Sequence, residues 1–413
     1  MLKAYCLIAG ILCSYMLCGQ EYAMDTTYKN LLDRMELEVY GTVLYNNYHW
    51  QTDTTKRNNV DMSHVVFAPT FHVSKNIAIE MEIEFEHGGT GSSMEFDKFE
   101  EFGEYEQEVE HGGEVVIEEL ELGWKIKPWL ELKAGKIKVP VGLANYYYKP
   151  TEYLTTTYNN VEETMLPVGW YEVGIGAGGN FGNNQKFEYQ VAFINALDNS
   201  AFSSANWIKR GSFQKFEYAN AQSFATALRL DYKLNEKSVA GVSGYAGNST
   251  PNRPKPDIRE DSWVTVADFH FHFEHERLFM QAMSIYGTLQ NASLISDANK
   301  NLSNNLNVKR TPVGSAVFGN FIEAGYDILP FICNNTNQSK LYLFGGYYYY
   351  DTMFKTSGET FNNPRWDRRE IRGGINYQWN NAVGVKADFT NRTIKIPENN
   401  IENTLTVAIT FNL

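Results

Sequence analysis

The chain has 413 residues, of which 43% are hydrophobic and 14% aromatic, and its formal net charge is −13. Its mean hydropathy of −0.39, without a run of about eighteen apolar residues after the N-terminal segment, argues against helical membrane spans. The negative charge argues against general binding of nucleic acid.

The N-terminus has the pattern of a secretory signal peptide. Lys3 supplies a positive charge, residues 4–17 form an apolar core, and Gln20 is the expected first mature residue. Cys18 raises the alternative of a lipoprotein, but Met16 and Leu17 are not the small residues that a lipoprotein signal requires. We therefore expect a signal peptide at residues 1–19, export by the Sec route, a short periplasmic segment at 20–34 and one domain at 35–413.

The mature chain keeps one cysteine, Cys333, which excludes an internal disulfide and a cysteine-based metal site. A signal peptide, no disulfide and amphipathic strands together indicate a Gram-negative envelope protein. We expect it to be integral to the outer membrane, in contact with lipid and lipopolysaccharide.

Strands with alternating character run from one end of the mature chain to the other. In the last stretch, Leu405, Val407 and Ile409 fall on one face of a strand and small polar residues on the other. The stretch 77–87 places four glutamates on one face and apolar residues on the other. Four carboxylates cannot be buried in a dry core without partners, so this face must meet water. Sixteen strands are predicted, at 35–48, 64–73, 77–87, 115–125, 130–139, 170–179, 187–195, 223–233, 239–246, 263–274, 278–289, 317–329, 341–351, 368–378, 383–392 and 404–413.

The connections alternate in length. Those after odd-numbered strands are mostly long, for example 88–114, 140–169 and 196–222. Those after even-numbered strands are mostly short, for example 74–76 and 235–237. Long loops on one side and tight turns on the other are typical of outer-membrane barrels, whereas a soluble β-sandwich has no reason to alternate in this way. The predicted fold is all-β: a sixteen-stranded antiparallel transmembrane β-barrel.

A barrel of this size leaves an aqueous channel, so its function depends on the residues that line the channel. Strand phase predicts an acidic wall, composed of Glu36, Glu38, Glu80, Glu82, Glu84, Glu119 and Glu121. It predicts a basic wall, composed of Arg229, Arg368, Arg372, Lys386 and Arg392. Opposed walls would create a transverse field that orients dipolar solutes. The alternative is that these residues are charged only because the lumen contains water.

The long loop 140–169 is the predicted constriction. The residues expected to narrow the channel are Lys136, Lys138, Tyr146, Tyr147, Lys149 and Glu152. The sequence G-K-I-K-V-P-V-G-L at 135–143, followed by M-L-P-V-G-W-Y-E-V-G-I-G-A at 165–177, resembles the phosphate-selective porin family, the porin O and P group.

The resemblance implies a homotrimeric sixteen-stranded porin whose third extracellular loop folds into the channel. It also implies anion preference, which in that family comes from a ladder of Arg and Lys. The carboxylates of the acidic wall, such as Glu80 and Glu82, would repel anions. Selectivity therefore stays open, with cationic or weakly selective transport favoured.

His270 and His272 share one strand face with Asp268 and Glu274, a pattern that could bind zinc or copper. A wet lumen with scattered polar residues explains it equally well, so we expect neither a metal nor a cofactor.

The favoured function is passive diffusion of small hydrophilic solutes or ions. One alternative is an adhesin or binding barrel, supported by the acidic, aromatic loop at 94–110. Another is an outer-membrane hydrolase, but the eight histidines form no recognisable Ser–His arrangement, so we expect no catalytic site.

Overall fold

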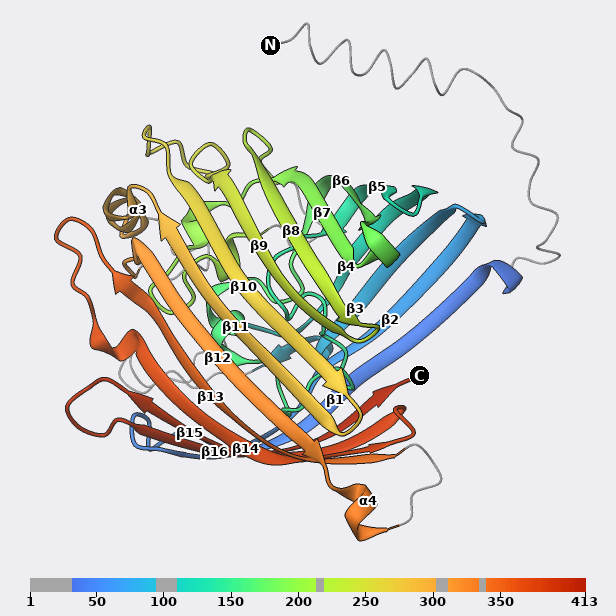
Figure 1. Ribbon diagram of the computed structural model, residues 1–413. Helices are drawn as coiled ribbons and strands as arrows, with labels where there is room; N and C mark the ends of the chain where they lie inside the picture. The colour runs from blue at the N-terminus through green and yellow to red at the C-terminus, as the bar shows by residue number, and fades with distance from the viewer. Residues whose placement is uncertain (1–31, 94–109, 213–218, 302–310, 334–338) are drawn as a thin grey trace, which may run out of the picture.

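The computed structural model describes residues 32–93, 110–212, 219–301, 311–333 and 339–413. Within these residues, sixteen antiparallel strands form a closed barrel in which β1 pairs with β16 (Figure 1). This confirms the predicted fold class and strand number. The predicted signal peptide and nearly all of segment 20–34 lie outside the described residues. Among the described helices, none is long and apolar enough to cross a membrane.

The strands are β1 Met35–Trp50, β2 Asn59–Ser74, β3 Ile77–Ser93, β4 Glu110–Lys127, β5 Leu130–Lys138, β6 Tyr171–Phe181, β7 Phe187–Asn195, β8 Phe224–Asn235, β9 Ser238–Asn248, β10 Trp263–His275, β11 Leu278–Leu289, β12 Ala316–Asp327, β13 Lys340–Lys355, β14 Asp367–Trp379, β15 Val383–Ile394 and β16 Ile401–Asn412. The short helices are η1 Leu32–Arg34, α2 Asn160–Met165, η2 Asn183–Gln185, η3 Asn199–Ala201, η4 Lys209–Gly211, α3 Ala292–Asn299, α4 Leu329–Ile332 and η6 Pro364–Trp366.

The predicted strand ends are correct for β7 and β11 and differ elsewhere. The largest differences are at β2, β3 and β4, which extend further toward the long loops than the apolar alternation indicates. Strand β12 was predicted to reach Leu329 but ends at Asp327. There Leu329 begins α4, with Pro330 in its first turn. Proline has no N–H for a strand ladder and is well accommodated at the start of a helix, which explains the difference.

Side-chain alternation decides which face of each strand meets lipid. On β16, Leu405, Val407 and Ile409 are exposed on the outside of the barrel, whereas Thr406 and Thr410 are buried inside. The pairing of β1 with β16 continues this alternation across the closure. The backbone amide of Leu413 also donates to the carbonyl of Val39, at the barrel end where both termini of the barrel lie (Figure 1). The outer surface is therefore an apolar band suited to hydrocarbon.

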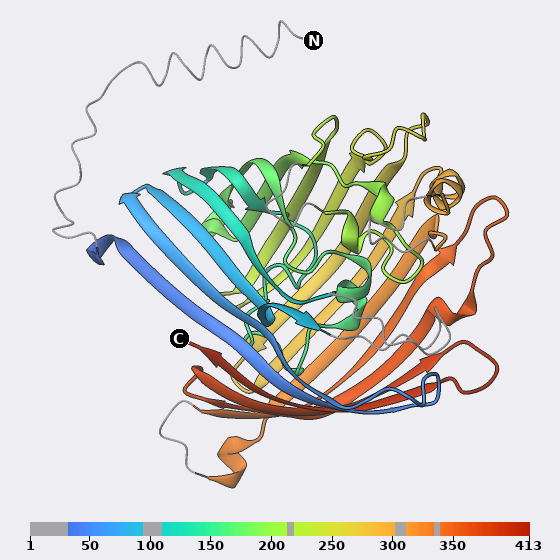
Figure 2. The same cartoon turned by 180° about the vertical axis from the view of Figure 1, so that it is seen from behind.

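The interior contains an apolar core as well as polar residues. Inward side chains of β8–β13 pack against loop 140–169 and the loop that follows β7. Two glycines permit close approach: a Cβ at Gly319 would lie 2.4 Å from Met165 Cε, and one at Gly287 would lie 2.2 Å from the Trp207 ring. Figure 2 shows these loop segments inside the ring of strands. Loops thus fill the lumen on the side of β8–β13.

Replacing Val407 by arginine tests the lipid-facing surface. Val407 lies near the middle of β16 and is 38% exposed on its outer face. We expect V407R to lower the free energy of unfolding of the barrel in lipid by about 2–4 kcal/mol, because it places a charge against hydrocarbon. Urea titration of protein folded into vesicles would measure this. The shape-matched V407T serves as control and should stay close to the parent; an equal loss in both variants would contradict the assignment.

Candidate functional site

Loop 140–169 begins at a buried attachment to β8 and β9. The guanidinium Nη1 of Arg229 donates to the carbonyl of Gly142 at 2.5 Å, and the Gly142 amide donates to Ser243 Oγ at 3.1 Å. Arg229 Nε also donates to Asp231 at 2.8 Å, and its guanidinium lies 3.8 Å from the centre of the Tyr146 ring. Gly142 has a φ of 79° and a Cβ there would lie 2.2 Å from Glu162, so this attachment requires glycine.

Glu162 joins the two limbs of the loop. Its carboxylate accepts hydrogen bonds from the amides of Leu143 at 2.7 Å and Ala144 at 3.0 Å. Asn159, which caps α2, donates to the same carboxylate at 2.7 Å. Burial raises the pKa of the Glu162 carboxyl, and the bonds from Ala144 and Asn159 oppose that rise. This buried side chain therefore joins the start of the loop to α2.

The far limb of the loop is attached to β14 and β15. Lys386 Nζ donates to the carbonyls of Tyr153 at 2.8 Å and Thr155 at 2.9 Å. Asp388 accepts from the Thr156 amide at 2.7 Å. The loop therefore crosses the inside of the barrel from β8 to β15.

Three of the predicted constriction residues on the loop contact the barrel interior through their side chains. Tyr146 donates to Gln190 at 2.6 Å, and the Tyr147 ring stacks on His272 with centroids 3.8 Å apart. Lys149 Nζ lies 2.6 Å from a carboxylate oxygen of Glu38.

The other predicted constriction residues lie beside these contacts. The amide of Lys149 donates to Glu152, which holds that carboxylate on the loop. Lys138 lies against the Tyr148 ring, at 4.1 Å, whereas Lys136 is turned toward the backbone carbonyl of Ile117.

The predicted basic wall lies on the inner face of the barrel but does not line the open lumen. Lys386 is fully buried under the loop, and Arg372 is buried with Glu370 at 3.3 Å. Arg392 is paired with Glu402, and Arg368 lies 4.5 Å from the centre of the Tyr350 ring. Arg229, Arg372 and Lys386 contact loop 140–169, which lies on this side of the barrel. The transverse field, one of the two interpretations of these charges, stays a prediction. The residues of this wall are Arg229, Arg368, Arg372, Lys386 and Arg392.

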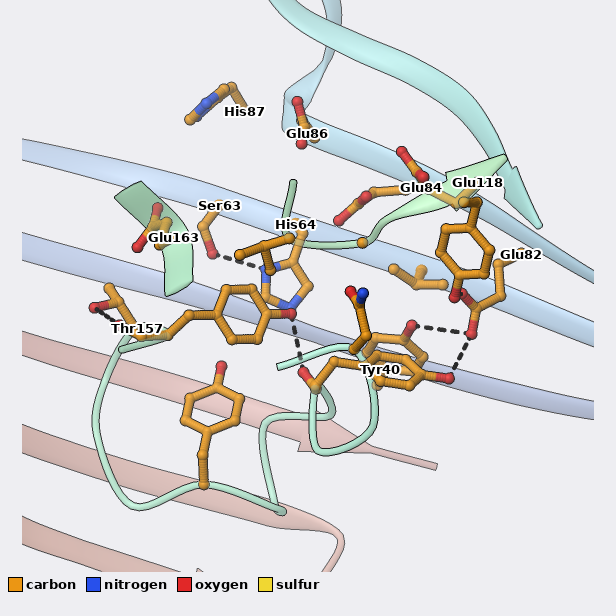
Figure 3. Close-up of a pocket in the computed structure, with 18 of the residues that line it drawn as sticks. Tyr40, Ser63, His64, Glu82, Glu84, Glu86, His87, Glu118, Thr157 and Glu163 are labelled. Atoms are coloured by element: carbon orange, nitrogen blue, oxygen red, sulfur yellow. Dashed lines mark hydrogen bonds between the residues drawn. The ribbon is translucent and has the colours of Figure 1, made fainter. Parts of the chain in front are cut away.

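Two cavities that share lining residues lie on the side of β1–β6. The loop-side cavity, of about 240 Å³, lies toward the long loops and is drawn in Figure 3. The turn-side cavity, of about 640 Å³, lies toward the short turns. Glu82 and Tyr148 line both cavities. This pair marks the boundary between them.

Tyrosines surround Glu82 at that boundary. Its carboxylate accepts hydrogen bonds from the hydroxyls of Tyr148 at 2.7 Å and Tyr171 at 2.5 Å, and lies 3.5 Å from that of Tyr40. The sequence prediction omitted Tyr40 and Tyr171 from the site. Tyr40 lies on the same strand face as Glu36 and Glu38, so side-chain alternation along β1 would have predicted that it faces inward.

The acidic wall divides between the two cavities. Glu84 lines the loop-side cavity, and Glu36, Glu38, Glu80 and Glu119 line the turn-side cavity. Glu36 lies at the rim, with its side chain 77% exposed and 3.0 Å from His72.

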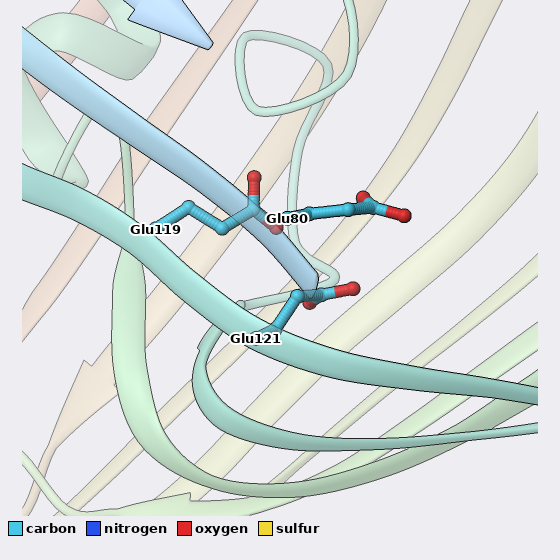
Figure 4. A group of neighbouring side chains, drawn as sticks. All are labelled: Glu80, Glu119 and Glu121. Carbon is cyan, nitrogen blue, oxygen red and sulfur yellow. The ribbon is translucent and has the colours of Figure 1, made fainter. Parts of the chain in front are cut away.

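Three members of the acidic wall form a cluster. Carboxylate oxygens of Glu80, Glu119 and Glu121 lie within 4.8 Å of one another (Figure 4). Glu121 already bonds to Lys133 Nζ at 2.6 Å, so one ammonium group neutralises part of this cluster.

Glu118 faces the loop-side cavity although strand alternation predicts that it faces lipid. The register between β3 and β4 shifts here: Glu82 pairs with Glu119 but Ile83 pairs with Ile117. Glu118 is the extra residue of a β-bulge, which lets two consecutive glutamates face inward. Alternation alone cannot reveal such a shift.

The histidine pair does not present a metal site. The two ring nitrogens of His270 lie 2.6 Å from Asp268 and 2.8 Å from Asp231, so both are already engaged. His272 stacks on Tyr147 and lies 3.0 Å from Gln281 through Nδ1. The two rings therefore do not converge on a common point, and the metal hypothesis for them does not fit this geometry.

No protein-family model matches the chain. An uncharacterized protein of Aquifex aeolicus (strain VF5) is 23% identical over 369 residues, which cover 87% of this chain and 76% of that protein. Among solved structures, OmpF of Salmonella typhi in complex with daunomycin matches with a TM-score of 0.54 and 10% identity, over 92% of this chain and 97% of that one. The anion-selective porin of Comamonas acidovorans matches with a TM-score of 0.52 and 9% identity, over 92% and 99%.

These similarities show that the chain has the fold of the outer-membrane porins. The fold, together with the apolar outer surface, makes the chain an integral outer-membrane β-barrel protein. The resemblance to the porin O and P group stays a prediction. Nearly all of the acidic loop 94–110 lies outside the described residues.

Replacing Arg229 by glutamine tests the attachment of the loop. We expect R229Q to lower the free energy of unfolding by about 3–5 kcal/mol, because it removes one partner of a buried charge network. The control is R369Q, which removes an exposed arginine on the outer face of β14 and should change stability by less than about 0.5 kcal/mol. Urea unfolding of both variants provides the comparison, and equal effects would refute a special role for Arg229.

Proposed function

We propose that the protein is an outer-membrane channel for passive diffusion of small hydrophilic solutes or ions, and that the path runs beside loop 140–169. The observation that carries the proposal is the pair of cavities that share Glu82 and Tyr148 as lining residues. The narrowest part of the path lies at this pair. Assembly as a homotrimer is part of the proposal and rests on the family resemblance.

The charges along the path favour cations. Carboxylates outnumber lysines in the lining of both cavities, by five to one on the loop side and by six to three on the turn side. Arginine is absent from both linings among the described residues. An anion would be repelled along this path, so we propose cation preference in place of the phosphate preference that the resemblance implies.

Two other functions have less support. We propose that the barrel is not an enzyme. Two of its histidines, His270 and His272, are held in buried contacts and are poorly placed to act as the base that a hydrolase needs. An adhesin would depend on loop 94–110, nearly all of which lies outside the described residues.

Conductance in a planar bilayer tests the channel and its selectivity. Under a potassium chloride gradient, we expect stepwise openings in threes and a reversal potential with the sign of cation preference. E84Q should shift the reversal potential toward zero, because it removes one lining carboxylate. E260Q, which makes the same change of charge on an exposed loop, is the control. Folded protein without conductance would overturn the proposal, and a reversal potential of opposite sign would overturn the selectivity.

Removing the Tyr148 ring tests the narrow part of the path. The ring lies between the two cavities, so we expect Y148A to raise the single-channel conductance. The control is Y286A, which removes a tyrosine exposed on the outer face of β11 and should leave conductance unchanged. If Y148A and the parent conduct equally, the path does not pass this residue.

A further inference from the structure

The loop-side cavity concentrates negative charge in a small space. Five carboxylates line a volume of about 240 Å³, and Lys209 is the only lysine in the lining that the structure describes. Lys209 lies at 4.0 Å from Glu163, and the side chains of both are about one-third exposed. The lining carboxylates are Glu82, Glu84, Glu86, Glu118 and Glu163. Carboxylates this close repel one another, and a cation that enters the cavity relieves the repulsion.

Two buried polar atoms in the same lining have no hydrogen-bond partner among the described residues. They are Nε2 of His64 on β2 and Oε2 of Glu118 on β4. His64 is 7% exposed and Glu118 is 8% exposed. Both residues line the cavity (Figure 3), and His64 Nδ1 lies 3.2 Å from Ser63 Oγ. Because Ser63 Oγ donates to the Thr42 carbonyl, Nδ1 of His64 is assigned the ring hydrogen and Nε2 is an acceptor. Buried polar atoms are normally hydrogen-bonded, so these two acceptors point to a ligand that donates N–H or O–H groups.

The tyrosines that line the loop-side cavity favour one chemical class of cation. Tyr40, Tyr148, Tyr153, Tyr158 and Tyr171 contribute to the lining. Aromatic rings attract organic ammonium groups, whereas magnesium keeps several of its waters and prefers oxygen ligands alone. A lining of carboxylates and aromatic rings is therefore better suited to an organic cation than to a hydrated metal ion.

We propose that the loop-side cavity binds a small organic cation with two primary ammonium groups. The carboxylates neutralise both charges, Glu118 Oε2 and His64 Nε2 accept N–H donors, and the tyrosines contact the hydrocarbon chain between the two ammonium groups. This inference rests on the proposed function, since it names a solute class for the same path. A solute held here stands next to Glu82 and Tyr148, at the entrance to the turn-side cavity.

Binding and conduction are measured separately to test this inference. Calorimetry on the folded full-length mature barrel in detergent uses 1,4-diaminobutane, butylamine and magnesium chloride as probes. We expect diaminobutane to bind at least about tenfold more tightly than either of the others. In planar bilayers, diaminobutane should interrupt the single-channel current in a concentration-dependent manner.

Variants connect the binding to the cavity. E118Q and H64Q should each weaken diaminobutane binding by about tenfold or more, because each removes or alters an acceptor. E260Q, on an exposed loop, is the control of equal charge change and should bind like the parent. Heat-modified migration on a denaturing gel verifies that each variant is folded.

The outcomes separate this inference from the proposed function. A conducting channel to which diaminobutane does not bind overturns the inference and leaves the channel intact. Binding of magnesium at least as tight as that of diaminobutane also overturns it, in favour of a metal ion. Folded protein that binds diaminobutane but does not conduct supports the site and overturns the channel.

Discussion

Lipid offers no hydrogen-bond partner to the backbone, and this constraint shapes the whole molecule. Each strand that crosses the hydrocarbon must be paired on both sides, so the sheet has to close on itself. The pairing of β1 with β16 closes the barrel and gives the backbone groups of these two strands their hydrogen-bond partners. Within the apolar band of the outer face, charged side chains of the strands are placed inward. The lumen therefore collects most of the charges of that part of the barrel.

On one side of the barrel, loop 140–169 supplies hydrogen-bond partners to charged side chains that face inward. Lys386 and Arg229 find their acceptors in loop carbonyls, and Asp388 finds its donor in a loop amide. The same loop brings apolar residues against β8–β13 and buries them. Arg229, Arg372 and Lys386 therefore attach the loop instead of facing an open lumen. What remains open is the side of β1–β6, where the carboxylates are in excess.

The sequence predicts the barrel well because each strand is recognised from residues that are neighbours in the chain. A period of two with long and short connections determines strand number, the facing of most residues and the side of the long loops. It fails where a single residue breaks the period, as at the bulge that turns Glu118 inward. It also fails where a partner comes from far along the chain. Nothing adjacent to Lys386 indicates that Tyr153 and Thr155 will cover it.

These two failures have a common consequence for selectivity. The sequence assigns both the acidic and the basic wall to the inner face, so both signs of charge are expected to line the lumen. Packing then buries four of the five basic side chains, while the bulge turns one further carboxyl group inward. In the proposed channel, a solute would therefore meet only the charges that loop packing leaves uncovered, and not those of the inner face as a whole. Two barrels with the same inward residues could thus differ in selectivity if their third loops attach to different strands.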